Sequence, residues 1–429
     1  MAGPVKTLVA LLLLAAGTSR AAAPDFDQGV AVRPALEQAR ENAGLSDQKA
    51  ARPEGVEGLE DAVWISVADE DAAALGTESG FPGREVVAAG GGVSVYQARI
   101  AELPRLADRM HEKLHKCGGF FTFRTLAAAR LALAAVPGAA AAREYSIDQG
   151  DRVRPMVAAI DEASLGRVIN QLAAYKNRYY TADTGVASAR WVADHWKSLA
   201  GGRSDISVEL YPHKGWAQES VILTMRGTES PDSVVVLGGH LDSIAGWGGD
   251  SAVAPGADDN GSGIAVLAEA IRVAVRTGYR PARTVKFIGY AAEEVGLRGS
   301  RDIAEAFQGA GVDVQGVIQF DMTAFRGSAE DILLISDYTD QAQNAFLGRL
   351  IDEYTDLRWG TTACGYACSD HASWNALGIP ASLPFEAKFD EDNPNIHSAR
   401  DTLAQIGGKA DHAVGFARLA AAYLAEMGK

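Results

Sequence analysis

Short apolar runs alternate with longer amphipathic stretches along the chain from Ser146 onward. Apolar positions at helical spacing predict helices, and short runs rich in Val, Ile and Phe predict strands. The helices are expected near 162–176, 185–199, 263–276, 302–307, 341–354, 370–377 and 409–426. The strands are expected near 206–210, 221–226, 233–238, 284–289, 316–320, 332–336 and 381–385. This alternation predicts an α/β fold, a three-layer globular domain whose central mixed, mostly parallel twisted sheet is flanked by helices.

The preceding part of the chain has a different pattern. Residues 24–143 combine Gly- and Ala-rich linkers with a strand-like run at 63–67 and helical stretches at 95–116 and 126–135. We interpret 24–143 as a small α+β propeptide and 144–429 as the catalytic domain. The boundary is supported by Cys117, because an exported protein seldom keeps an odd thiol and this one would leave with a removed segment.

The first residues have the features of an export signal. Lys6 precedes an apolar run over 8–16, and small residues follow at 21–23, where a signal peptidase would cut. A retained signal anchor is the alternative, but a run of about ten residues is too short for a bilayer that needs roughly twenty. We therefore predict a cleaved signal peptide at 1–23 and a secreted, extracellular or periplasmic, protein that is free of the membrane after cleavage.

Composition narrows the choice of partners. The 429 residues are 47% hydrophobic, enough to bury a core, and 40 basic against 55 acidic residues give a net charge of -15. A strongly acidic chain repels phosphate backbones, so nucleic acid is not expected as a partner. We expect a monomer. Cys364 and Cys368 are close enough in sequence to form a small disulfide loop in an oxidising compartment.

Polar side chains gather where the predicted strands end. His240, the pair Glu293 and Glu294, and Asp321 each follow a different strand. Because ligands bind at the carboxyl ends of strands in open α/β sheets, these side chains are expected to converge. Two loops add the pair Asp258 and Asp259, just before a helix, and His397. Each feature alone has an ordinary structural interpretation, such as a helix cap or a solvated pair, but their order along the chain favours one common site.

Imidazole and carboxylate ligands together suit zinc. Two zinc ions about 3.5–4 Å apart need one bridging carboxylate and two terminal ligands each, which makes five groups. The candidates are His240, Asp258, Glu294, Asp321 and His397. Glu293 is left over, and a free carboxylate beside activated water is a general base. Asp242, two residues after His240, is a candidate to orient that imidazole from behind.

Motifs in this order resemble the secreted bacterial leucyl aminopeptidases with a co-catalytic zinc pair, over residues 145–429. The resemblance is carried by Gly-Gly-His240-Leu-Asp242, Pro-Gly-Ala-Asp258-Asp259-Asn, Ala-Ala-Glu293-Glu294-Val-Gly-Leu, Gln-Phe-Asp321-Met-Thr, Cys364-Gly-Tyr-Ala-Cys368 and Ile396-His397-Ser, and Asn177-Arg178-Tyr179-Tyr180 extends it. It implies that Asp258 bridges the metals through a loop with a cis Asp258-Asp259 bond. Glu294 and His397 would complete one zinc site, and His240 and Asp321 the other. Glu293 would be the base, and Tyr366 would polarise the scissile carbonyl.

The resemblance also implies the substrate. Its members release N-terminal residues from peptides or proteins, and a large apolar residue such as Leu is expected to be preferred. The matching apolar pocket consists of Met322, Ile335, Cys364, Cys368, Phe385, Phe389 and Ile396. One position departs from the pattern, since Asp392 stands where the resembling enzymes carry an aromatic residue. The mouth of the pocket is therefore expected to be more open or more tolerant of a cation.

Other chemistries remain as alternatives. The same scaffold supports carboxypeptidases, deacylases and glutaminyl cyclases, and non-catalytic relatives arise when ligands are lost. His111-Glu-Lys-Leu-His115 matches the H-E-x-x-H zinc motif, although Lys113 is unfavourable in a buried helix, and an exposed propeptide helix is the preferred interpretation. The resemblance suggests that such a propeptide is inhibitory or chaperone-like. Cys364, Cys368 and His371 could form a structural zinc site, but a fourth ligand is missing.

Overall fold

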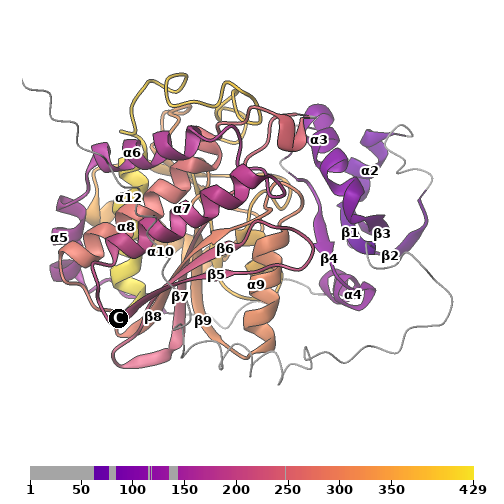
Figure 1. Ribbon diagram of the computed structural model, residues 1–429. Coiled ribbons are helices and arrows are strands. Elements are labelled where there is room, and N and C mark those ends of the chain that lie inside the picture. The colour runs from indigo at the N-terminus through magenta and orange to yellow at the C-terminus, as the bar shows by residue number, and fades with distance from the viewer. Residues whose placement is uncertain (1–61, 77–83, 115, 117, 135–143, 247) are drawn as a thin grey trace, which may run out of the picture. The chain divides into compact units, whose positions relative to one another are not determined.

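The computed structural model describes residues 62–76, 84–114, 116, 118–134, 144–246 and 248–429 (Figure 1). The predicted signal peptide, His115 and Cys117 lie outside these residues. The chain divides into the compact units Met1–Asp47 and Gln48–Lys429, and every described residue belongs to the second unit. Among the described helices, none combines the length and the apolar character that a bilayer span requires.

The central sheet has six strands in the order β12-β9-β7-β8-β6-β5. Their bounds are β5 Ile206–Tyr211, β6 Ser220–Met225, β7 Ser230–His240, β8 Arg283–Tyr290, β9 Asp313–Gln319 and β12 Ala381–Ser382. The pairs from β12 to β8 are parallel, while β8 with β6 and β6 with β5 are antiparallel. The prediction of a mixed, mostly parallel sheet is confirmed.

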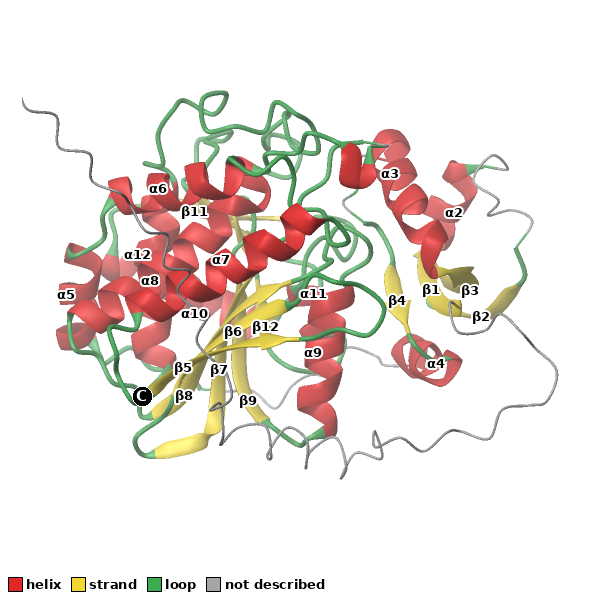
Figure 2. Cartoon of the chain, in the orientation of Figure 1, coloured by secondary structure: helices red, strands yellow, loops and turns green. Residues whose placement is uncertain are grey.

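Alternation along the strands divides the core between the two faces of this sheet. Val235 and Leu237 of β7 pack into one apolar cluster, and Val234 and Val236 pack into another on the opposite face. Successive side chains of a strand point to opposite faces, so a strand buried on both sides reads as a continuous apolar run. Figure 2 shows α9 and α11 on one side of the sheet and α7, α8 and α12 on the other. The predicted three-layer α/β fold is confirmed.

The helices of this part follow the apolar periodicity closely. They are α5 Gly150–Ala158, α6 Glu162–Ala173, α7 Asp183–Leu199, α8 Gly263–Arg276, α9 Arg298–Gly309, α10 Gln341–Tyr354, α11 His371–Asn375 and α12 Ala413–Met427. The short helix α5 was not predicted, because Pro155 interrupts its pattern. The helix expected from residue 302 begins earlier, at Arg298.

A second, three-stranded sheet was not predicted. It has the order β11-β10-β13, with β10 at Ile332–Ile335, β11 at Trp359–Thr362 and β13 at Pro384–Phe385. The single strand expected over 381–385 is wrong, because β12 pairs with β9 in the large sheet whereas β13 pairs with β10 in the small one. The chain changes sheets at Leu383, and a continuous apolar run carries no signal for that change.

The described residues before 135 form a separate α+β layer with its own apolar cluster. Four antiparallel strands have the order β2-β3-β1-β4, with β1 Ala62–Ala68, β2 Val86–Gly90, β3 Val93–Arg99 and β4 Phe121–Phe123. The helices are α2 Asp69–Leu75, α3 Leu103–Leu114 and α4 Leu126–Ala134. The helical stretch expected over 95–116 is wrong at its start, since 93–99 is a strand whose Val95 and Tyr96 are buried beside β1.

Candidate metal centre

The sheet delivers its polar residues to one edge. His240 is the last residue of β7, Glu293 and Glu294 follow β8, and Asp321 follows β9. All four side chains are buried. Because β7, β8 and β9 are parallel neighbours, their carboxyl ends meet, and the convergence expected from the sequence is present.

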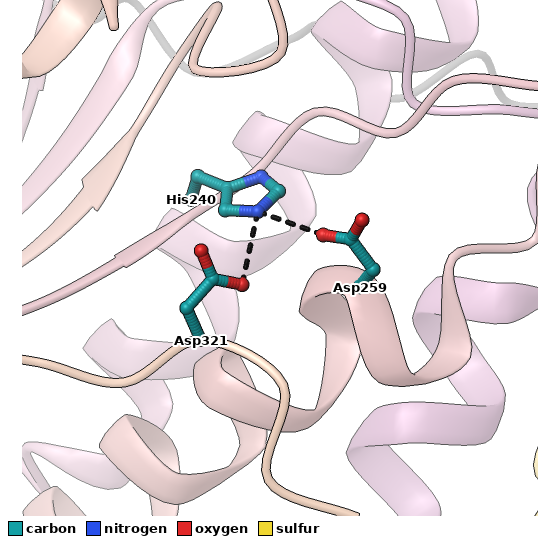
Figure 3. Close-up of side chains that lie close together, drawn as sticks. All are labelled: His240, Asp259 and Asp321. Atoms are coloured by element: carbon teal, nitrogen blue, oxygen red, sulfur yellow. Dashed lines mark ion pairs between the residues drawn. The ribbon is translucent and has the colours of Figure 1, made fainter. Parts of the chain in front are cut away.

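One cluster forms around His240. Its Nε2 lies 2.9 Å from Oδ1 of Asp259 and 3.2 Å from Oδ1 of Asp321. Figure 3 shows both carboxylates pointing toward this ring nitrogen. One nitrogen and two oxygen ligands in mutual reach are a ligand set that suits zinc.

A second cluster forms around His397, in the loop after β13. Its Nε2 lies 2.9 Å from Oδ2 of Asp259 and 2.8 Å from Oε2 of Glu294. Asp259 therefore directs one oxygen to each cluster. Within each cluster, the ligand atoms lie within 4.8 Å of one another. A carboxylate shared in this way has the geometry of a bridging ligand between two metal ions.

The assignment of the bridge to Asp258 is wrong, and so is the expected cis Asp258-Asp259 bond. The shared carboxylate is that of Asp259, and the cis peptide joins Asp259 to Asn260. The Asp258 side chain points elsewhere, where it accepts hydrogen bonds from Ala324 N (2.9 Å) and Asn393 Nδ2 (3.0 Å). The physical reason is that adjacent side chains on extended backbone face opposite ways, so one of two successive aspartates faces the metal site.

Two residues that the sequence did not suggest hold the Asp259 loop. Asp401 accepts hydrogen bonds from the backbone N–H groups of Asp258 and Asp259, both at 3.0 Å. The buried guanidinium of Arg178 donates to the carbonyls of Leu241 at 2.8 Å and Gly256 at 2.9 Å. Arg178 thus ties the end of β7 to the metal-ligand loop. Its presence in the family-like run at 177–180 was the one available signal.

Asp242 fixes the second carboxylate pair from behind. Its Oδ1 accepts from Glu293 N at 3.0 Å, and its Oδ2 accepts from Glu294 N at 3.2 Å. Oδ1 also lies 3.5 Å from Nδ1 of His240, on the side of the ring away from the cluster. Asp242 was predicted to orient His240 alone. The structure shows that it also anchors both glutamates.

Glu294 and Glu293 occupy different positions. Glu294 belongs to the cluster of His397, whereas Glu293 belongs to neither cluster and lines the adjoining pocket. Burial raises the pKa of Glu293 well above its ordinary value, and the carboxylates of Asp370, Glu294 and Asp321 add to the rise, while His240 opposes it. Burial likewise raises the pKa of Glu294 to about 7. A group with a raised pKa next to a candidate metal site has the character of a proton acceptor.

The electrostatic balance of the site fits metal cations. Buried carboxylates outnumber the two imidazoles, and no group in the described residues donates a hydrogen bond to either carboxylate oxygen of Glu294. Burial opposes it, but contacts with His240 and His397 hold the pKa of Asp259 below its usual range. Buried negative charge without donors is costly unless cations neutralise it. The residues present therefore fit two divalent metal ions.

An apolar pocket adjoins this centre. Its lining includes Met322, Cys368, Phe385, Phe389 and Ile396 together with Tyr366, Glu293 and the metal-cluster residues. Ile335 and Cys364 belong to the same apolar cluster but do not line the pocket. Leu383, which the sequence did not suggest, does line it, and so does Asp392.

The cysteines and the second histidine motif are also placed. Cys364 and Cys368 form the predicted disulfide, which removes both thiolates from any zinc site with His371. His371 is buried, and burial lowers its pKa to about 3. His111, on α3, joins neither metal cluster; its Nδ1 lies 2.9 Å from Nδ1 of His397. The expectation of a merely exposed helix is therefore wrong at His111.

Paired histidine–carboxylate clusters at the carboxyl edge of an α/β sheet are typical of metal-dependent hydrolases. The sequence model of peptidase family M28 matches residues 220–422. A probable leucine aminopeptidase of Arthroderma otae is 37% identical over 258 residues, 59% of this chain and 70% of the relative. Leucine aminopeptidase 1 of Colletotrichum graminicola is 32% identical over 65% of this chain and 71% of the relative.

Solved structures agree with these relatives. The LapA aminopeptidase of Legionella pneumophila has a TM-score of 0.74 at 28% identity, with 86% of this chain and 98% of that chain covered. LapB from the same organism has a TM-score of 0.73 at 27% identity, with coverage of 86% and 100%. The chain belongs to peptidase family M28. The prediction of an enzyme, a hydrolase of the protease class, is confirmed, and the relatives with which it groups are aminopeptidases.

Proposed function

We propose that this chain is a secreted, two-zinc aminopeptidase that releases large apolar residues, of the leucine type, from the N-termini of peptides. The observation that carries the proposal is the carboxylate of Asp259, whose two oxygens each face a different histidine. His240, Asp259 and Asp321 would hold one ion, and Asp259, Glu294 and His397 the other. When bound, zinc lowers the pKa of coordinated water toward about 7 and polarises a carbonyl.

Glu293 supplies the proton transfer in this proposal. Its carboxylate lines the pocket between the metal clusters and the apolar wall, and burial keeps its pKa high. It would accept the proton of the attacking water and return it to the leaving amine. Tyr366 lines the same pocket and is placed to donate a hydrogen bond to the carbonyl oxygen of the scissile bond.

The substrate's first residue would occupy the apolar pocket. Burial of a Leu side chain against Met322, Phe385 and Ile396 supplies binding energy that a small or polar side chain cannot. The free α-amino group would lie against the carboxylates of the metal clusters, which restricts cleavage to the first peptide bond. The test is hydrolysis of leucine p-nitroanilide compared with its N-acetylated analogue.

We also propose that the described N-terminal layer is an inhibitory propeptide, removed after export. Two contacts support it. His111 meets the outer nitrogen of His397 at 2.9 Å, and Lys116 Nζ lies 5.3 Å from the centre of the Tyr366 ring. These contacts place propeptide side chains against a candidate metal ligand and against the pocket. Export is supported by the signal-like sequence at 1–23 and by the Cys364–Cys368 disulfide.

Removal of residues 1–143 is therefore expected to raise hydrolysis of leucine p-nitroanilide. In the full-length chain, H111A should raise it partly, because each 1.4 kcal/mol of lost contact corresponds to about tenfold in the population of the open form. E112A is the matched control, since Glu112 is exposed on the same helix. Equal rates for full-length and trimmed protein would contradict an inhibitory role.

A further inference from the structure

Asp392 is the one acidic side chain that lines the substrate pocket outside the metal centre. It is half-buried, beside the rings of Phe385 and Phe389, whose centroids are 5.7 Å apart. Its neighbour Asn393 is anchored by hydrogen bonds to Asp258 and from its backbone N–H to Glu386. The position of Asp392 in the pocket wall is therefore set by a firmly held loop.

The surroundings of Asp392 offer it no cation. It forms no ion pair with any Lys or Arg of the described chain, and the charges that act on it, those of Asp258, Asp259 and Asp390, are negative. Partial burial raises its pKa to about 6, so the carboxylate is nonetheless ionised at neutral pH and above. A partly desolvated carboxylate without a counter-ion gains free energy when a ligand supplies one.

The rest of the pocket suits the stem of a long cationic side chain. Phe385, Phe389 and Ile396 form an apolar wall, and Tyr366 lies edge-on to Phe389 with centroids 5.8 Å apart. Lys and Arg bury their methylene groups along such surfaces while the charged end seeks a polar partner. Aromatic faces also attract cations directly. Leucine has the apolar part of this complementarity but not the charged part.

We propose that Asp392 extends the specificity of this pocket to peptides that begin with Lys or Arg. The cation of the first residue pairs with the Asp392 carboxylate while its methylene chain packs against the rings. The inference rests on the proposed aminopeptidase function, because it uses the same pocket. It names a substrate class that an apolar pocket alone would reject.

The test compares kcat/KM for lysine, arginine and leucine p-nitroanilides with the trimmed enzyme at one pH above neutrality. The wild type is expected to cleave all three. D392N should lower the lysine-to-leucine ratio of kcat/KM roughly 10- to 100-fold, the usual worth of a hydrogen-bonded charge. D392E should keep the ratio within about fivefold of the wild type, because the carboxylate remains. D390N, at an exposed neighbouring carboxylate, should leave the ratio unchanged.

Cleavage of leucine but not of lysine or arginine p-nitroanilide by the wild type would overturn the proposal. An unchanged lysine-to-leucine ratio in D392N would also overturn it, and would leave the aminopeptidase function intact. Failure of the wild type on all three substrates would contradict the proposed function itself, and this inference with it.

Discussion

Replacing Glu293 by glutamine is expected to lower kcat on leucine p-nitroanilide roughly 100- to 10,000-fold, the usual contribution of a positioned general base. The glutamine side chain keeps the volume of the buried glutamate but cannot accept a proton. Glu293 lies in neither metal cluster, so zinc binding should persist. The backbone hydrogen bond from Glu293 N to Asp242 does not depend on the side chain, so the loop should keep its place.

The measurement is the steady-state rate together with the zinc content of the same preparation. E353Q is the control, because Glu353 is exposed and its partner is Arg154, on another part of the chain. Full activity in E293Q would remove Glu293 from the role of base. Loss of zinc along with activity would instead make it a metal ligand.

The second large effect is expected at the shared aspartate. Asp259 directs one oxygen to His240 and the other to His397, so D259N should weaken both clusters at once. Loss of a partner behind a ligand typically costs 10- to 100-fold in metal affinity, and we expect loss of the shared ligand to exceed roughly 100-fold. D259N should therefore lose zinc and hydrolysis together.

The adjacent aspartate provides the matched control. Asp258 accepts hydrogen bonds from Ala324 N and Asn393 Nδ2 and faces away from both clusters. D258N keeps one of these acceptors, so it should bind zinc far more tightly than D259N, with its main cost in thermal stability. Bound zinc is measured after dialysis against graded zinc concentrations. Retention of both ions by D259N, or a greater loss in D258N, would contradict the bridge at Asp259.

Apolar periodicity was sufficient for the sheet and its helices. Strands buried on both faces, such as β7, read as continuous apolar runs, and the polar residues directly after them mark the edge where the site forms. The ligand types at those strand ends also led to the two-metal interpretation. These signals are local, because each lies within a few residues of the element that creates it.

What the sequence did not reveal depends on orientation and on distant contacts. Spacing alone does not show which of Asp258 and Asp259 faces the histidines, because the choice follows from the backbone of the loop. Asp401 lies far along the chain from the loop that it holds, and nothing near it indicates this partner. The same holds for His111, whose contact with His397 joins segments 286 residues apart.

The most direct test of the central claim uses the trimmed wild-type protein, stripped of metal by a chelator and then titrated with zinc. Bound zinc and hydrolysis of leucine p-nitroanilide and of its N-acetylated analogue are followed together. We predict that activity returns as zinc fills two sites per chain, and that only the substrate with a free amino group is cleaved. Activity that survives complete removal of metal, or equal cleavage of both substrates, would contradict a metal-dependent aminopeptidase.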